Sequence, residues 1–370
     1  MYGNEKIKKS FEIEKFISTF ASVEKVTIND IARLTGLSKG TVDRVLHNRG
    51  EVSKKSFEKV MAVIREQGYE PNLYASFLAN KKKRVIAIVL PHPEPGSYWE
   101  LATSGIQKIG EEEQPFGIET SLVTYNEFQA DSFREACTKV LQEQVSGVVI
   151  APMFQYETQV FVQELGSRNI PYVFVDTKLD TPDGHLAFFG IPSYKSGFLC
   201  ADMLLQGEKA QEVLVVRITR DKERQSDPTL IRRAGFLDYM REHNPGCTIR
   251  SLFVSPTDAA VTDEALSSFF KEFPQVKHVV MFNSRIHLIV PFLERHPFPG
   301  RRVIGFDNLD ANLRALENGT VTMLIAQHPE RQVQEAVHSL SEFLVFRRKP
   351  KEADNHMHMD LLTRFNIEDY

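Results

Sequence analysis

The sequence has few cysteines and no long apolar run. Its three cysteines are Cys137, Cys200 and Cys247. They are widely spaced and form no C-x-x-C pair, so we expect buried thiols rather than a disulfide framework or a zinc site. No stretch of about 18 apolar residues is present, which argues against a membrane-spanning helix. Residues 1–25 lack the apolar core of a secretory signal, so we expect a cytoplasmic protein.

Sequence motifs of common enzymes are also missing. The chain contains no Gly-x-Ser-x-Gly, no Walker A sequence and no Gly-x-Gly-x-x-Gly. An enzyme would therefore have no visible arrangement of nucleophile and base. We expect a protein without catalytic activity and without a cofactor.

Length and charge indicate more than one domain. The chain has 370 residues, of which 42% are hydrophobic, and this length is typical of two or three compact units. Residues 1–84 contain 17 Lys and Arg against 10 Asp and Glu, whereas the remainder contains 28 against 39. Residues 1–84, called the basic head below, are thus basic and the rest of the chain is acidic, which suggests that only the basic head binds a polyanion.

The basic head has the pattern of three short helices. Thr27 precedes apolar residues at helical spacing, and Gly36 stands where a tight turn is expected. Ser38 is a suitable first residue for a second helix, and Ser53 for a third helix that ends at Gly68. After Pro71, residues 72–80 could form a further short helix, followed by the basic link 81–84.

From Val85 onward, short apolar runs alternate with amphipathic segments. This alternation predicts βαβ units, and the length allows two α/β lobes with parallel sheets whose ligands bind at the carboxyl ends of the strands. The predicted strands are Val85–Leu90, Ser121–Thr124, Gly147–Ala151, Tyr172–Val175, Val213–Ile218, Val279–Phe282, Val303–Phe306 and Val321–Ile325.

Residues 26–46 carry the most specific pattern. A helix-turn-helix needs a short first helix, a glycine turn and a polar start to the second helix, whose first residues meet base edges in the major groove. Ser38, Lys39 and Thr41 occupy that start. The segment therefore predicts DNA binding, and the alternative is a three-helix module that binds protein.

Residues 26–46 resemble the DNA-binding headpiece of the lactose-repressor/purine-repressor family. The resemblance continues through residues 51–53, 68–72 and 78–79. It implies that the second helix reads bases, and that the helix after Pro71 is a hinge that wedges a leucine into the minor groove. Gly40 and Asp43 depart from the usual pattern, which affects the operator sequence. The implied DNA-contacting residues are Thr27, Ser38, Lys39, Gly40, Thr41, Arg44, His47, Asn72 and Leu78.

The remaining chain resembles the effector domain of the same family, which shares its fold with periplasmic sugar-binding proteins. The matching segments include residues 97–99, 170–176, 232–236, 281–283, 303–307 and 327–329. Tyr98 and Trp99 could instead be core aromatics, and Asp307 could merely cap a helix. The resemblance implies a cleft between the lobes whose effector-binding residues are Tyr98, Trp99, Asp176, Ser193, Arg232, Asn283, Phe306, Asp307 and Gln327.

The expected domain order follows from both resemblances. It comprises an extension of unknown role (1–25), a helix-turn-helix domain (26–70), a hinge and linker (71–83) and an effector domain (84–370). Lobe 1 is expected at about 84–190 and 328–350, and lobe 2 at about 191–327 and 351–370, with crossings near 189–192 and Gln327. His356 and His358 have metal-like neighbours but lie in a segment resembling the family's last strand, so no metal site is expected.

The predicted function is sequence-specific regulation of transcription. The partners would be double-stranded operator DNA and a small-molecule effector, most simply a neutral or weakly charged mono- or disaccharide, with a homodimer matching a palindromic operator and no membrane contact. A purine or a phosphorylated sugar remains an alternative effector, and a phosphate would call for clustered Arg and Lys. Two different functions would fit parts of the pattern, namely a soluble sugar-binding protein and an α/β enzyme fused to a DNA-binding head.

Overall fold

The computed structural model describes residues 27–46, 52–67, 83–179, 181, 184–218 and 228–369. Contacts divide the chain into two compact units, Met1–Lys81 and Lys82–Tyr370. Residues 1–25, His47 and the hinge residues 71–82, which include Asn72 and Leu78, lie outside the described residues. Their roles therefore stay predictions. In the part of the chain that is described, no helix is both long and apolar enough to cross a bilayer.

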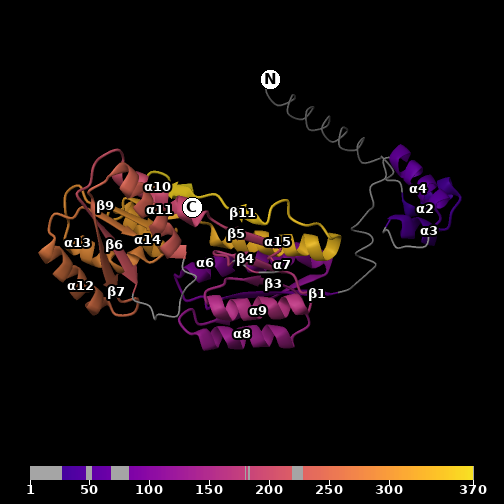
Figure 1. The fold of residues 1–370 in the computed structure, drawn as a ribbon, viewed down its shortest axis with the longest axis horizontal. Helices are drawn as coiled ribbons and strands as arrows, with labels where there is room; N and C mark the ends of the chain where they lie inside the picture. Colours follow the sequence, from indigo (N-terminus) through magenta and orange to yellow (C-terminus); the bar gives the residue numbers. More distant parts are fainter. Residues whose placement is uncertain are drawn as a thin grey trace, which may run out of the picture. The chain divides into compact units, whose positions relative to one another are not determined.

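The first unit contains the three predicted helices, α2 (Ile28–Thr35), α3 (Lys39–Leu46) and α4 (Lys54–Gln67) (Figure 1). The Thr27 side chain accepts the Asp30 N–H, and the Asp30 carboxylate accepts the Thr27 N–H, which is a capping box at the start of α2. Gly36 ends this helix in the left-handed conformation, with φ of 61°. The three helices close around a small buried core of Ile31, Val42, Val45 and Val60.

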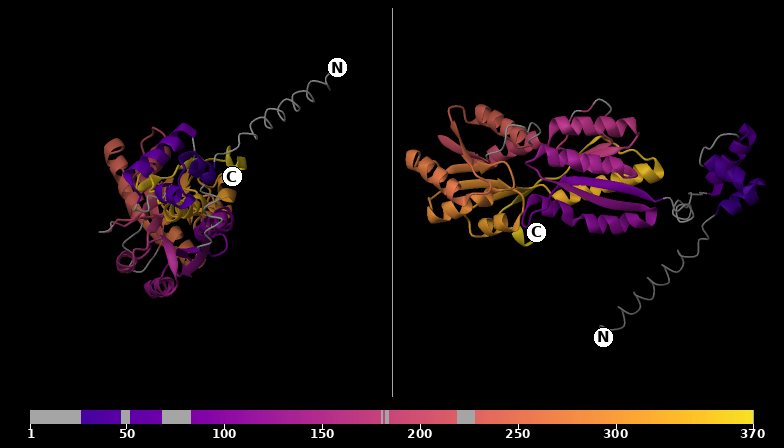
Figure 2. Two further views of the ribbon diagram at one scale, coloured as in Figure 1. Left: turned by 90° about the vertical axis from the view of Figure 1, so that its right-hand side faces the viewer. Right: turned by 90° about the horizontal axis from the view of Figure 1, so that it is seen from below.

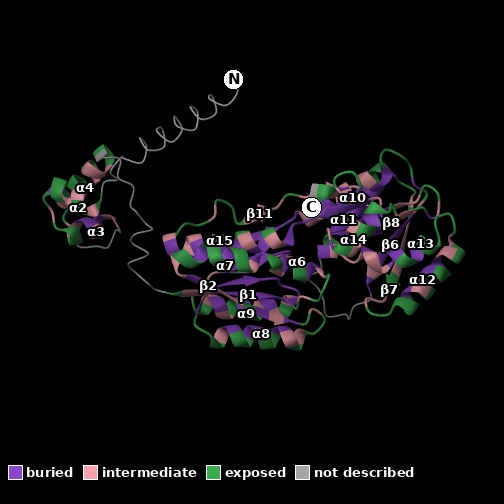
Figure 3. Cartoon of the chain, turned by 180° about the vertical axis from the view of Figure 1, so that it is seen from behind, coloured by how far each residue is buried: buried purple, intermediate pink, exposed green. Residues whose placement is uncertain are grey.

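The first sheet of the second unit has the strand order β11-β5-β4-β3-β1-β2, and all of its pairings are parallel. Its inner strands are almost wholly apolar because helices cover both faces of the sheet (Figures 2 and 3). The strands are β1 (Arg84–Pro91), β2 (Ile118–Tyr125), β3 (Val145–Ile150), β4 (Tyr172–Val175), β5 (Ala187–Gly190) and β11 (Asp354–His356). The helical segments are α6 (Tyr98–Ser104), α7 (Ile106–Glu113), η1 (Gln114–Phe116), α8 (Ala130–Gln142), α9 (Gln155–Ser167) and α15 (Pro329–Phe346).

The second sheet repeats this plan with the order β12-β10-β9-β8-β6-β7, in which only β12 pairs antiparallel. Its strands are β6 (Glu212–Ile218), β7 (Thr248–Val254), β8 (His278–Met281), β9 (Arg302–Phe306), β10 (Met323–Ala326) and β12 (Asp360–Leu362). Its helical segments are α10 (Ser193–Leu205), α11 (Pro228–His243), α12 (Ala259–Glu272), η2 (Ile286–Leu288), α13 (Val290–Arg295) and α14 (Asp310–Glu317). The short η3 (Ile367–Asp369) follows β12.

The chain passes between the two sheets three times. It leaves the first sheet between β5 and α10, returns between β10 and α15, and leaves again between β11 and β12. The first two passages lie near the positions expected from the sequence. The expectation that residues 351–370 belong to the second lobe is wrong for Asp354–His356, because this strand pairs with β5 in the first sheet. Its polar sequence gave no apolar pattern from which to predict that pairing.

Candidate functional site

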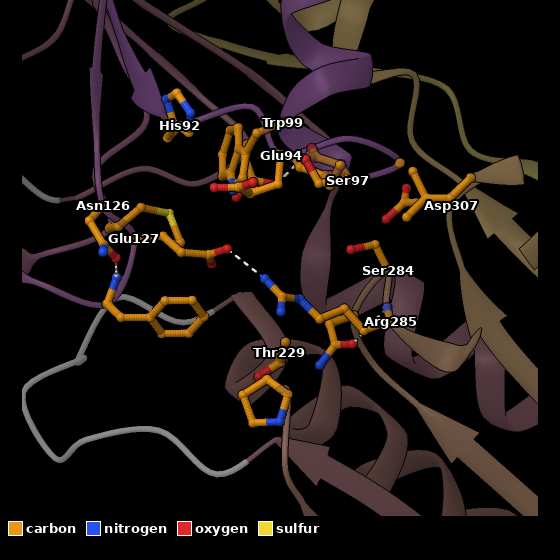
Figure 4. Close-up of a pocket in the computed structure, with 18 of the residues that line it drawn as sticks. His92, Glu94, Ser97, Trp99, Asn126, Glu127, Thr229, Ser284, Arg285 and Asp307 are labelled. Atoms are coloured by element: carbon orange, nitrogen blue, oxygen red, sulfur yellow. Dashed lines mark hydrogen bonds and ion pairs between the residues drawn. The ribbon is translucent and has the colours of Figure 1, made fainter. Parts of the chain in front are cut away.

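A cavity of about 730 Å³ lies between the two lobes of the second unit (Figure 4). Most of its wall comes from loops and helix starts that follow the carboxyl ends of strands in both sheets, as expected for this architecture. Seven of the nine sequence-predicted effector residues line it: Tyr98, Trp99, Asp176, Arg232, Asn283, Asp307 and Gln327.

The other two predicted residues lie outside this lining. Phe306 is fully buried in the core of the second lobe, where the Arg232 guanidinium lies 4.6 Å from the centroid of its ring. Ser193 is the first residue of α10, and its carbonyl accepts the Ser196 hydroxyl. Phe306 thus does not line the cavity itself but packs against Arg232, which does.

Arg232 is the most deeply buried cation of the cavity wall. It lies on α11 and is only 2% exposed. Its Nη1 donates to the Phe282 carbonyl at 2.8 Å, and its Nη2 donates to Gln327 Oε1 at 2.7 Å. These two hydrogen bonds hold the guanidinium in one position, and its Nε has no hydrogen-bond partner among the described residues.

Two glycines allow α11 to approach α10 closely enough to place Arg232. A Cβ on Gly197 would lie 1.7 Å from the Arg232 carbonyl oxygen, and a Cβ on Gly235 would lie 2.0 Å from the Tyr194 carbonyl oxygen. Real side chains do not fit at such distances. The two helices can therefore pack this closely only with glycine at both positions, a requirement that the sequence pattern did not reveal.

Asp307 follows β9 and is fully buried. Its Oδ2 accepts the Gln327 side-chain N–H at 2.9 Å, whereas its Oδ1 has no hydrogen-bond partner among the described residues. Burial raises the pKa of the Asp307 carboxyl to about 7, against the opposing effects of Arg232 and Gln327. Asp307 does not cap α14, because that helix begins after Leu309 without a side-chain cap.

Asp176 occupies the corresponding position in the first lobe, directly after β4. Its Oδ1 accepts the Tyr98 hydroxyl at 2.9 Å, and its backbone N–H donates to Gln332 Oε1 at 3.0 Å. Burial, together with the nearby charges of Asp176 and Asp307, raises the pKa of Tyr98 well above its ordinary value. Both aspartates have left-handed backbones, with φ of 64° at Asp176 and 68° at Asp307.

Two oppositely charged residues of the cavity lining that contact each other were not predicted from sequence. Glu127 follows β2 and Arg285 follows β8, and their side chains form an ion pair of 2.6 Å between Arg285 Nη2 and Glu127 Oε1 (Figure 4). The predicted residue Asn283 supports this pair, because its Oδ1 accepts the Arg285 backbone N–H at 2.9 Å. No local pattern marks either residue, since the pairing depends on how the lobes face each other.

Among the described residues, the charges of the cavity wall are mostly negative. The described lining residues include four carboxylates and two guanidiniums, and no lysine is among them. Both guanidiniums already donate to protein acceptors. The carboxylates are those of Glu94, Glu127, Asp176 and Asp307, and the guanidiniums are those of Arg232 and Arg285.

In the first unit, the start of α3 is open to solvent. Ser38, Lys39, Gly40 and Arg44 are exposed, and the Ser38 side chain accepts the Thr41 N–H at 3.2 Å. Arg44 Nε donates to the Gly40 carbonyl at 3.2 Å. The absence of a side chain at Gly40 leaves space beside the Arg44 guanidinium.

Comparisons with known proteins agree with both parts of the fold. A model of the periplasmic binding protein domain matches residues 86–347, and a model of the lacI family of bacterial regulatory proteins matches residues 27–72. A solved structure from Bacteroides fragilis, assigned to the LacI transcriptional regulators, is 33% identical, with a TM-score of 0.73. The match covers 78% of this chain and 100% of that chain. The chain belongs to the lacI family. This family consists of regulatory proteins, in agreement with the prediction that the chain is not an enzyme.

Other lacI-family relatives match over shorter stretches. The HTH-type transcriptional regulator DegA of Bacillus subtilis is 30% identical over 182 residues, or 49% of this chain and 52% of the relative. The catabolite repressor/activator of Escherichia coli is 31% identical over 156 residues, or 41% of this chain and 45% of the relative. The matched stretches thus span about half the length of these relatives.

Proposed function

We propose that this lacI-family protein is a transcriptional regulator that binds operator DNA through α3. The proposal is supported by the exposed start of α3 within the segment that matches the family. Lys39 and Arg44 are both exposed on this helix, and each has a long side chain that can reach a groove that admits the helix. Arg44 would exchange its contact with the Gly40 carbonyl for a base or a phosphate.

We further propose that the effector is a neutral mono- or disaccharide bound in the cavity. The observation that carries this proposal is the buried Asp307 Oδ1, which has no partner among the described residues and borders the cavity. A ligand hydroxyl would satisfy it, and an unsatisfied buried acceptor costs about 1–3 kcal/mol. Asp176, Arg232, Asn283 and Gln327 offer further acceptors and donors for hydroxyls, and Trp99 offers an apolar wall.

The charge of the described cavity wall favours a neutral sugar over a phosphorylated one. Carboxylates outnumber guanidiniums there, and each guanidinium already has an acceptor. A phosphate group would add two negative charges to a described lining in which carboxylates already outnumber guanidiniums.

The working unit is proposed to be a homodimer. One recognition helix reads only a few base pairs, and a two-fold dimer presents two such helices to a palindromic site. Sedimentation of the full chain with and without a selected DNA duplex tests this directly. A single protein copy on each duplex would contradict it.

A binding experiment can test the regulator and the effector together. Duplexes selected from a random library by the full chain would serve as the DNA probe. Neutral sugars would be added in a titration followed by the fluorescence of Trp99, the only tryptophan in the sequence. Asp307→Ala and Arg232→Ala should lose the response to sugar yet keep DNA binding. The control Asp310→Ala removes an exposed carboxylate three positions from Asp307 and should behave as wild type. Wild-type sugar affinity in both cavity variants, or a nucleobase as the bound ligand, would contradict the proposal.

A further inference from the structure

An ion pair crosses the cavity from one lobe to the other. Glu127 belongs to the loop after β2 in the first lobe, and Arg285 belongs to the loop after β8 in the second. Arg285 Nη2 lies 2.6 Å from Glu127 Oε1, and the two side chains are only 23% and 14% exposed (Figure 4). A pair so close and so shielded is screened far less than an ordinary surface ion pair.

Local hydrogen bonds hold both loops in place. The Arg285 backbone N–H donates to Asn283 Oδ1, and the Phe128 backbone N–H donates to Asn126 Oδ1, each at 2.9 Å. The Arg285 guanidinium also lies 5.6 Å from the centroid of the Phe128 ring. The ion pair is therefore built on two ordered turns.

The pair determines which charge the cavity offers to a ligand. The other guanidinium of the described lining, that of Arg232, is directed to the Phe282 carbonyl and Gln327. Arg285 is more exposed than Arg232 and is therefore the described guanidinium that an anionic group would reach more readily. Glu127 already occupies it, and an incoming anion would have to displace one carboxylate and remain beside it.

We propose that Glu127 is a specificity-determining residue that excludes anionic effectors by neutralising Arg285. This inference rests on the proposed function, in which the cavity holds the effector. A neutral hydroxyl can approach the pair without repulsion, whereas a phosphate or a carboxylate meets the Glu127 charge. Replacing Glu127 by glutamine keeps its shape and an acceptor for Arg285 but leaves the pair with a net positive charge.

Inorganic phosphate is the probe that tests this inference. Thermal shifts would be measured at constant ionic strength for the full-length wild type, Glu127→Gln and the double variant Glu127→Gln/Arg285→Gln. Phosphate should stabilise Glu127→Gln with an affinity roughly tenfold or more above that of the wild type, as expected for a new charge-assisted hydrogen bond. The double variant should lose this gain. The affinity for a hexose 6-phosphate, relative to that for the neutral hexose, should likewise be higher in Glu127→Gln than in the wild type and should fall again in the double variant.

A matched control comes from β2, the strand that precedes the Glu127 loop. Glu119 on β2 pairs with Lys83 at 2.6 Å, away from the cavity, and Glu119→Gln removes the same charge. It should not increase phosphate binding. Glu127→Ser, with a shorter neutral side chain, repeats the main test should the glutamine variant not fold.

Three results would overturn the inference: equal phosphate binding by the wild type and the Glu127 variants, a gain that survives in the double variant, or the same gain in Glu119→Gln. These results do not depend on identifying the natural effector. Failure of the proposed function has a different signature, namely that no neutral sugar changes Trp99 fluorescence or DNA binding in the wild type.

Discussion

Asp307→Asn should stabilise the folded protein while it weakens effector binding. Burial raises the pKa of Asp307 from 3.8 to about 7, so the unfolded chain releases this proton at a lower pH than the folded protein does. The free energy of unfolding therefore falls as the pH rises from 3.8 to about 7, and the full cost is present above that range. At 1.36 kcal/mol for each pKa unit, this cost is roughly 4 kcal/mol at pH 8 and less than half of that at pH 5. Asparagine cannot titrate, it tolerates the left-handed backbone at this position, and its carbonyl can still accept the Gln327 N–H.

Urea unfolding of the full chain at pH 5 and pH 8, followed by Trp99 fluorescence, measures this difference. The variant should be more stable than the wild type at both pH values, with a clearly larger gain at pH 8. Its affinity for the neutral sugar that the wild type binds should fall. If the asparagine carbonyl accepts the Gln327 N–H, the acceptor at Oδ1 is replaced by an NH2 group, which can only donate a hydrogen bond. Asp310→Asn, at an exposed position nearby, should show neither effect. A stability gain that is absent, or equal at the two pH values, would refute the assignment of a raised pKa to Asp307.

Three further substitutions address the headpiece and the helix crossing. Arg44→Ala should abolish binding to the selected DNA and leave sugar binding intact; a normal gel shift would mean that α3 is not the reading helix. Thr27→Ala removes the capping box of α2 and should destabilise the first unit by about 1 kcal/mol, seen as lower protection of α2 amides from hydrogen exchange. Gly197→Ala places a methyl group against the Arg232 carbonyl, and should cost about 1–3 kcal/mol in stability and lower sugar affinity. Lys195→Ala, exposed on the same helix, should leave both unchanged, and an unaltered melting temperature in Gly197→Ala would contradict the close approach.

The sequence pattern predicted most strands of both sheets, including the edge strand β2, but it missed the inner strand β5 and the edge strands β7 and β11. β1 and β4 are continuous apolar runs because helices cover both of their faces, and both were predicted. β7 was not predicted, because this edge strand carries exposed Phe253 and partly exposed Arg250 among its residues. β11 consists of Asp354, Asn355 and His356, whose strand conformation is imposed by pairing with β5. Tertiary context overrides local propensity at such positions.

The residues of the candidate site also fall into two groups, those that could be predicted from sequence and those whose contacts depend on tertiary structure. Asp176, Asn283 and Asp307 could be predicted because polar residues directly after apolar strands gather at one end of a parallel sheet. Glu127 and Arg285 could not, because their contact depends on the positions of two lobes that no local pattern specifies. The close crossing of α10 and α11 could not be predicted either. In a sequence, a glycine inside a helix indicates only a locally less stable position, and only the structure shows the backbone of another helix packed against it.

The arrangement of the strand-end groups explains how a ligand could act on more than its own site. Tyr98 and Asp176 belong to the first lobe, Arg232 and Asp307 belong to the second, and Gln327 lies at a passage between them. Gln332 Nε2 donates to the Gln327 carbonyl at 3.0 Å, which joins the two sets of groups through the crossing itself. A ligand shifts an equilibrium only by the difference in its affinity for the two states. A sugar bonded to one lobe alone would bind equally well whether the lobes were close or apart, whereas a sugar bonded to both sets must favour the arrangement that brings them together. In the proposed function, the hydroxyls of the sugar therefore have to be matched across the cavity for its binding to change how the lobes are arranged.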